Sequence, residues 1–341
     1  FINDETQYIQ SSFFLYLFNM FCGLYEKYKT NNTNKSLNKL ITFKPPFPPS
    51  YTISSNGSNK KRGPQYSKCI FVPKDTYPIF PWIEHQCFLV KKPHNKSTIV
   101  ILYIKNKSNK NTSKNTIIYS HGSSFDLGTL FPTLIDISTV LKCDVISYDY
   151  TGYGQSTGEF QEKEIYSDID EVIDFTVVNL HIDIEHIVLL GNSIGTVPSF
   201  YIAAKPQFCG VYGMILISPI ASGNNLIKYK DETLPKEADV FNTIEFSKEI
   251  ICPVLIIHGK LDTVIPVEQS NMLGKNIKNR FVWIPNKGTH WNLFTCYRSK
   301  TFRKIIKYLD FLKDNRTKLS CRNKILDFSG ENDVDTTVVK F

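Results

Sequence analysis

An apolar run that ends in a glycine-flanked serine constrains this chain more than any other feature. Ile187–Leu190 is wholly apolar and leads directly into Gly-Asn-Ser-Ile-Gly at Gly191–Gly195. A G-x-S-x-G pattern between a strand and a helix is typical of a sharp turn that exposes a nucleophilic serine. We expect glycine at Gly191 and Gly195 because a side chain there would collide with the neighbouring strand or helix. The helix start that follows points backbone N–H groups at whatever the serine attacks.

Buried apolar segments alternate with amphipathic segments through the central part of the chain. The predicted strands are His85–Lys91, Thr98–Lys105, Asn115–Ser120, Cys143–Tyr150, the run before the serine, Tyr212–Ile220, Pro253–His258 and Phe281–Ile284. The predicted helices are Leu127–Lys142, Glu162–Val178, Ile194 to about Ala204, Ile265–Ile277 and residues 297–314. Such alternation predicts an α/β fold with a mainly parallel sheet and helices on both faces. Between two of the strands, the polar Asn106–Asn115 stretch predicts a hairpin loop.

The domain organisation follows from composition along the chain. At 341 residues and 42% hydrophobic, the chain can bury a sizeable core in one large domain or two small ones. We predict one domain over residues 40–314, with residues 221–249 as a cap or insertion because they lack a clean period. Residues 315–341 form a polar tail, and residues 1–39 form an apolar segment and a polar linker.

Before about residue 78 the sequence does not read as α/β. The proline-rich Phe43–Tyr51 stretch should run extended over the surface, since its prolines exclude a helix or a central strand. Residues 53–64 read as a polar linker.

The apolar Phe13–Tyr25 segment is too short to cross a bilayer, which takes about 20 residues. It predicts an interfacial helix, with Cys22 available for S-acylation. The alternative is a helix packed on the domain. The sequence starts at Phe1 rather than methionine, so we expect a trimmed N-terminus. We expect peripheral association with a membrane on its cytoplasmic side.

Charge and cysteine usage narrow the function classes. The net charge of +8 comes largely from Asn/Lys-rich stretches, which indicates biased composition with weak attraction to anionic membranes. No zinc-finger spacing, RNA-binding signature or basic region with heptads is present, so we expect no nucleic-acid partner. The eight cysteines are scattered without a C-x-x-C pair, which favours a reducing compartment. The sequence lacks the ligand spacing of a metal site, and it lacks the G-K-[ST] ending of a phosphate loop. We therefore predict no metal and no cofactor.

Three residues that follow predicted strands have the order of a hydrolytic triad. A serine hydroxyl needs a base to take its proton, and the base needs an acid to hold its tautomer. Ser193, Asp262 and His290 occur in the order serine, acid, histidine, which is the order of the α/β-hydrolase arrangement. We assign Ser193 as nucleophile, His290 as general base and then acid, and Asp262 as the carboxylate that orients the histidine.

A tetrahedral intermediate also needs two N–H donors. We predict the backbone N–H groups of Ile194 and Ser123, with Ser124 as a substitute for Ser123. His258 precedes the acid and is interpreted as structural, whereas His121 is interpreted as shaping the oxyanion loop. Asp126 and Asp149 suit loop hydrogen bonds better than the role of triad acid.

Four motifs together resemble the α/β-hydrolase domain-containing protein 17 group. They are Ser-His-Gly-Ser-Ser-Phe-Asp-Leu-Gly at 120–128, Ser-Tyr-Asp-Tyr-Thr-Gly-Tyr-Gly-Gln-Ser-Thr-Gly at 147–158, Gly-Asn-Ser-Ile-Gly-Thr-Val-Pro-Ser at 191–199 and Pro-Val-Leu-Ile-Ile-His-Gly-Lys-Leu-Asp at 253–262. The likeness covers roughly residues 40–312, including the proline-rich stretch. It implies a membrane-bound serine hydrolase that removes palmitate from protein cysteines.

The chain departs from that group at three places. Only Cys22 precedes the domain, where the group has a cysteine cluster; Trp291 follows His290, where the group commonly has asparagine; and the 106–115 insert has no counterpart. The expected partners are S-palmitoylated membrane proteins or acyl lipids at a membrane surface. A lipid esterase such as a monoacylglycerol lipase is the alternative with the same triad. A non-catalytic scaffold on the same fold is a further alternative, which a missing triad residue would have favoured.

Overall fold

The computed structural model describes residues 48–55, 66–93, 97–108, 115–223, 226 and 240–315. The predicted apolar segment with Cys22, and the tail from residue 316 onward, lie outside the described residues.

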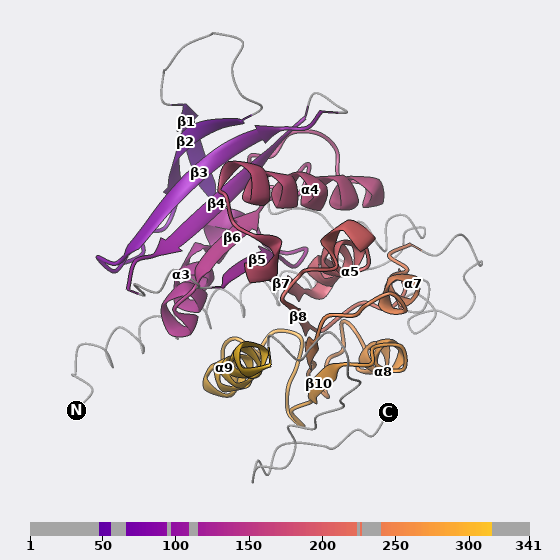
Figure 1. Ribbon diagram of the computed structural model, residues 1–341. Coiled ribbons are helices and arrows are strands. Elements are labelled where there is room, and N and C mark those ends of the chain that lie inside the picture. Colours follow the sequence, from indigo (N-terminus) through magenta and orange to yellow (C-terminus); the bar gives the residue numbers. More distant parts are fainter. Residues whose placement is uncertain are drawn as a thin grey trace, which may run out of the picture.

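A single ten-stranded sheet forms the centre of the described protein (Figure 1). Its order is β1-β2-β3-β4-β6-β5-β7-β8-β9-β10. The strands are β1 Tyr51–Ser55, β2 Tyr66–Pro73, β3 Ile83–Lys91, β4 Thr98–Asn106, β5 Thr116–Ser120, β6 Asp144–Tyr148, β7 Ile187–Asn192, β8 Gly213–Ile217, β9 Val254–Ile257 and β10 Arg280–Trp283. The first four strands and the β4–β6 pair are antiparallel, and the remaining pairs from β6 to β10 are parallel.

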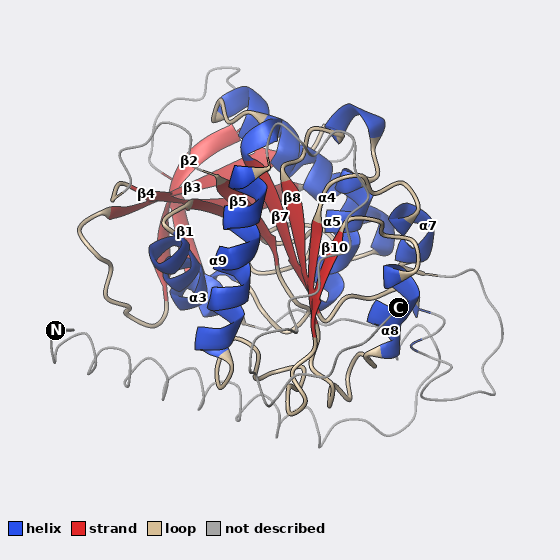
Figure 2. Ribbon diagram, turned by 60° about the horizontal axis from the view of Figure 1, so that its bottom comes forward, coloured by secondary structure: helices blue, strands red, loops and turns tan. Residues whose placement is uncertain are grey.

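Helices cover both faces of this sheet, and each face has its own core (Figure 2). The helices are α3 Leu127–Leu141, α4 Glu162–Asp174, α5 Thr196–Ala203, α7 Thr243–Ser247, α8 Glu268–Gly274 and α9 Arg298–Asp314. Side chains of α3 and α9 pack in one core, and side chains of α4, α5, α7 and α8 pack in the other. The parallel strands are buried on both faces and therefore read as continuous apolar runs. The predicted fold class is thus confirmed.

Most predicted elements agree with the structure to within a few residues, with two exceptions. The Asn106–Asn115 stretch is not a hairpin loop, because β4 and β5 are not neighbours: β6 lies between them. The helix predicted over Glu162–Val178 ends at Asp174 and continues as a π-helical turn, Phe175–Asn179.

The N-terminal part of the sheet was not predicted. β1 and β2 lie where we expected a linker and irregular chain, because an edge ribbon needs little periodic apolar character. Tyr51 contradicts the expected surface course of the proline-rich stretch, since its side chain is 0% exposed. Pro48 and Pro49 lie in no helix or strand, and β1 begins after them as an edge strand.

The described part of residues 221–249 packs beside α5 and α8 through α7. Within the ranges that the structure describes, no helix combines the length and apolar character needed to cross a membrane.

Candidate active site

Ser193 lies in a strained turn between β7 and α5. Its φ is +56°, in the left-handed region that a side chain disfavours. The turn continues as one 3-10 turn, Ser193–Gly195, before α5 begins at Thr196. Strain of this kind persists only where the surroundings enforce it, and it concentrates at functional sites.

The two flanking glycines are required for close packing, as predicted. A Cβ on Gly195 would lie 1.9 Å from the carbonyl oxygen of Ser120, at the end of β5. A Cβ on Gly191 would lie 2.5 Å from the carbonyl oxygen of Gly195, at the helix start. Both distances are far below a van der Waals contact, so the serine turn fits against the strand and helix only with glycine at these positions.

Asp262 and His290 come together from the loops after β9 and β10. His290 Nδ1 lies 2.8 Å from Asp262 Oδ2, and the Ser218 hydroxyl donates to the same oxygen at 2.8 Å. The backbone N–H groups of Val264 and Ile265 donate to the other oxygen, Oδ1, at 2.9 and 2.8 Å. Four donors therefore fix one carboxylate in one orientation.

The electrostatics around Asp262 favour its ionised form. Burial alone raises the pKa of a carboxyl group, but His290 and His258 hold the pKa of Asp262 well below its ordinary value. An ionised carboxylate facing Nδ1 selects the histidine tautomer whose Nε2 is free to accept a proton.

His258 lies behind the acid and away from the pocket. Its Nε2 donates to the Ile265 carbonyl at 2.8 Å, and its Nδ1 lies 2.6 Å from the Ser270 hydroxyl. Nε2 is also 3.4 Å from Asp262 Oδ2. The residue is fully buried, so it supports the acid and its loop rather than reaching substrate.

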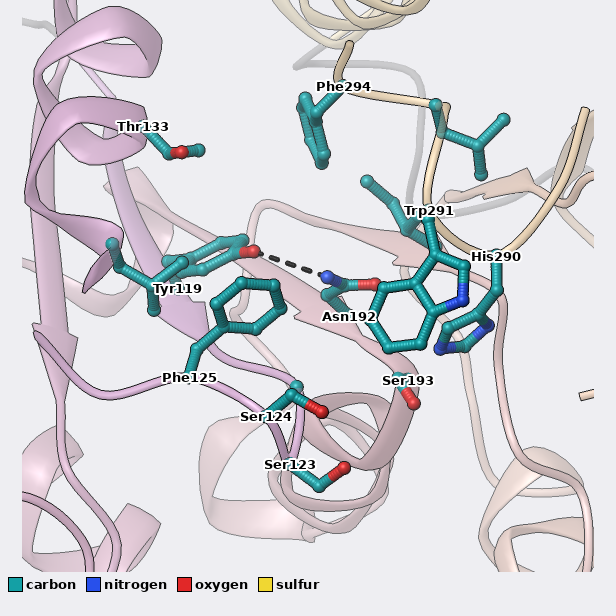
Figure 3. Close-up of a pocket in the computed structure, with 14 residues that line it drawn as sticks. Tyr119, Ser123, Ser124, Phe125, Thr133, Asn192, Ser193, His290, Trp291 and Phe294 are labelled. Atoms are coloured by element: carbon teal, nitrogen blue, oxygen red, sulfur yellow. Dashed lines mark hydrogen bonds between the residues drawn. The ribbon is translucent and has the colours of Figure 1, made fainter. Parts of the chain in front are cut away.

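Ser193 and His290 line the same pocket, with Ser123 and Ser124 beside them (Figure 3). No hydrogen bond joins Ser193 to His290 within the described part of the chain. Gly122, Thr133 and Asn192 also line the pocket, and the remaining side chains of the wall are largely apolar: Tyr119, Phe125, Leu130, Ile217, Trp291, Leu293 and Phe294. A polar end that carries the serine thus continues into an apolar wall built by α3 and the loop after His290.

Trp291 is part of that wall and packs edge-on against the His290 ring, with centroids 4.9 Å apart at 80°. Asn192 also lines the pocket, and its amide donates to the Tyr119 hydroxyl at 3.5 Å (Figure 3). None of the described residues of the 221–249 segment lines the pocket.

The predicted oxyanion donors flank the serine. Ser123 lines the pocket, and in the described ranges no backbone carbonyl accepts from its N–H group. The Ile194 N–H group lies in the first turn of a helix, where backbone donors have no intrahelical acceptor. The Ile194 side chain is buried, so only its backbone can serve.

A buried polar network holds the loop that carries Ser123. His121 Nδ1 lies 2.9 Å from the Gly122 carbonyl, and His121 Nε2 lies 3.3 Å from Asp149 Oδ1. Asp149 also accepts from the Leu127 N–H group and from the Tyr51 hydroxyl. Sequence reasoning placed His121 and Asp149 at this loop but missed Tyr51, because a lone tyrosine after prolines carries no signal of burial.

Asp126 is the N-cap of α3, not part of the pair with His290. Its side chain accepts from the Thr129 N–H group at 3.0 Å and from the Ser50 N–H group at 2.7 Å. It thus fixes the start of the helix that forms one pocket wall.

Curated proteins with related sequences carry the name predicted from the motifs. The chain is 36% identical over 180 residues to α/β-hydrolase domain-containing protein 17B of Xenopus tropicalis, covering 53% of this chain and 60% of that protein. It is 34% identical over 180 residues to human 17B, with the same shares covered, and 36% identical over 154 residues to mouse 17C, covering 45% and 47%. The chain therefore spans about half to three fifths of these relatives' length. The resemblance to this group is confirmed. No protein-family model matches the chain.

Solved structures agree on the fold. An esterase from Pyrococcus furiosus aligns with a TM-score of 0.55 at 17% identity, covering 67% of this chain and 91% of that one. Est1E of Butyrivibrio proteoclasticus, solved with ferulic acid, aligns with a TM-score of 0.53 at 16% identity, covering 64% and 97%. At this identity the likeness establishes the α/β-hydrolase fold and nothing more specific.

Proposed function

We propose that this chain is a serine hydrolase that cleaves acyl thioesters or esters through an acyl-enzyme. The supporting observation is the convergence of three loops: a strained Ser193 shares a pocket with His290, and His290 Nδ1 is 2.8 Å from the buried Asp262. Nucleophile, base and orienting acid are the parts that acyl transfer needs.

In this mechanism His290 takes the Ser193 proton as the hydroxyl attacks the acyl carbonyl. Asp262 stabilises the imidazolium that forms. The N–H groups of Ser123 and Ile194 receive the developing oxyanion. His290 then protonates the leaving thiol or alcohol. Water next attacks the acyl-enzyme carbonyl while His290 takes its proton, and His290 returns that proton to Ser193 as the acid leaves.

The preferred substrate class is an S-palmitoylated protein at a membrane. The similarity to the 17B and 17C proteins supports this choice, and so does the apolar wall that starts beside Ser193. A fatty acyl chain needs an apolar surface to bind against. Protein and lipid substrates share this chain and differ in the leaving group, which is a cysteine thiol in one and a glycerol hydroxyl in the other. Peripheral membrane association through Phe13–Tyr25 and Cys22 remains a proposal from the sequence, since both lie outside the described residues.

A lipid esterase is the second candidate, because an apolar pocket beside the same three residues also suits a monoacylglycerol. The test is turnover of a palmitoyl-thioester peptide beside a monoacylglycerol, at matched concentrations. Preference for the peptide supports depalmitoylation, and preference for the glycerol ester moves the chain to lipid metabolism with the mechanism intact.

Ser193→Ala is the variant that tests the mechanism. We expect it to lose turnover of both substrates by at least about 10⁴-fold and to fold normally. Ser199→Ala is the matched control: Ser199 is a buried serine of α5 that donates to the Gly195 carbonyl and does not line the pocket. Turnover by Ser193→Ala comparable with that of the wild type would refute the proposal.

A further inference from the structure

Two cysteines meet across neighbouring strands, apart from the pocket. Cys69 of β2 is paired directly with Cys87 of β3 in the antiparallel register. Their Sγ atoms are 3.0 Å apart and hydrogen-bonded, and both residues are free thiols. Both are buried, with 8% and 2% of their surfaces exposed.

The backbone at this pair suits a disulfide. Directly opposed residues of antiparallel strands have Cα atoms about 4.5–5.5 Å apart, within the range of about 4.4–6.8 Å found in disulfides. The two sulfur atoms need to approach by only about 1 Å to reach bonding distance. Neither strand has to shift its register for the bond to form.

The two thiols differ in acidity. The hydrogen bond with Cys87 lowers the pKa of Cys69, although burial acts in the opposite direction. The same hydrogen bond, together with burial, raises the pKa of Cys87. For Cys252, another buried thiol, burial raises the pKa to about 12. Cys69 is therefore the thiol of the pair that more readily becomes a thiolate, which is the reactive form.

Access to Cys69 is through the edge of the sheet. Cys69 is paired on its other side with Ser55, the last residue of the edge strand β1. Local opening of strand ends costs much less than global unfolding. Opening of this end of β1 is therefore the route by which a small reagent would reach Cys69, since only 8% of the residue is exposed in the closed fold.

We propose that Cys69 and Cys87 form a reversible disulfide site that reacts with small-molecule disulfides such as glutathione disulfide. The Cys69 thiolate attacks one sulfur of the reagent, forming a mixed disulfide and releasing one glutathione thiolate. Cys87 then loses its proton and attacks Cys69 Sγ, which releases the second glutathione. The two protein thiols are oxidised and the reagent is reduced to two thiols. This inference is independent of the proposed hydrolase activity.

The bond would tie together the part of the sheet that supports α3. Cys69, Cys87, Tyr51 and Phe71 belong to one core cluster, and the Phe71 ring packs 5.4 Å from the Phe131 ring of α3. Closing the chain between residues 69 and 87 restricts the unfolded state. We expect the oxidised protein to have a Tm about 5 °C higher than the reduced protein.

The experiment uses the folded wild-type protein in glutathione buffers of increasing disulfide content. Samples are acid-quenched, alkylated under denaturing conditions and mapped by mass spectrometry. We expect a linked pair of peptides containing Cys69 and Cys87, reversed by dithiothreitol, and the rise in Tm. If both cysteines are still alkylated as free thiols when the exposed Cys209 and Cys296 carry glutathione, the proposal is wrong.

Two variants sharpen the result. Cys87→Ala should lose the linked peptides and the Tm rise, and should accumulate glutathione on Cys69 because the resolving thiol is missing. Cys252→Ala removes another buried cysteine and should keep both the linked peptides and the Tm rise. A Tm rise of the same size in Cys87→Ala would contradict the proposal. Mapping of the wild type decides the question even if Cys87→Ala fails to fold.

Discussion

The buried hydroxyl of Tyr51 offers the sharpest test of how the N-terminal strand supports the site. Tyr51 donates to Asp149 Oδ2 at 2.5 Å and accepts from the Gln155 N–H group at 3.0 Å. Tyr153 is a matched comparison, because it too is 0% exposed but its buried hydroxyl has no hydrogen-bond partner among the residues that the structure describes. Tyr51→Phe and Tyr153→Phe therefore remove the same atom from two fully buried rings.

The expected magnitudes differ because of what each hydroxyl leaves behind. A hydrogen bond to a charged group contributes about 1.5–3 kcal/mol, and Tyr51→Phe also strands the Gln155 N–H group. Burial already raises the pKa of Asp149, which means that its ionised form is disfavoured in the fold. Loss of the Tyr51 donor disfavours the ionised form further. We expect Tyr51→Phe to lower the free energy of unfolding by about 2–3 kcal/mol. Tyr153→Phe should change it by less than about 0.5 kcal/mol, or increase it, since no bond is lost.

Urea denaturation of the wild type and both variants measures these differences, provided that the m-value is unchanged. Equal losses for the two variants would mean that ring packing, not the hydroxyl, accounts for the effect. No loss for Tyr51→Phe would refute the assignment of Tyr51 as a support of Asp149 and the oxyanion loop.

Three further changes test other contacts. Gly195→Ala should destabilise the fold by about 3 kcal/mol or more, measured by thermal melting, because the new Cβ meets the Ser120 carbonyl; a normal Tm would contradict this. Lys92→Met should lower the free energy of unfolding, measured in urea, by about 3–5 kcal/mol. The buried ammonium contacts the carboxylates of Glu164 and Asp168 at 2.6 Å, and the substitution leaves both without their counter-ion. Lys248→Met should leave the free energy of unfolding nearly unchanged, because the ion pair of Lys248 with Glu245 is exposed to solvent. Similar losses of stability in Lys92→Met and Lys248→Met would refute the reasoning. Because the pKa of Asp262 is below its ordinary value, its ionised form stabilises the fold above about pH 4, and this stability is lost as pH falls. The difference in free energy of unfolding between the wild type and Asp262→Asn, measured by denaturation at pH 7, 5 and 3, should therefore become smaller toward acid pH. A difference that does not change with pH would contradict this prediction.

Local patterns in the sequence were enough to predict the fold class and the elements that carry the site. Parallel strands buried on both faces give continuous apolar runs, and glycines appear where a tight turn allows nothing larger. Gly195, with no room for a Cβ against Ser120, is such a case. Because the carboxyl ends of parallel strands share one edge of the sheet, the order of Ser193, Asp262 and His290 was enough to predict that they converge.

Long-range pairing decided the rest. Tyr51 is 98 residues from Asp149, and nothing local to either residue reveals that one donates to the other. Cys69 and Cys87 are scattered cysteines in the sequence and become a pair only through the β2–β3 register. A short edge ribbon such as β1–β2 is stabilised by the strands and helix beside it rather than by its own periodicity, so only the folded chain shows it.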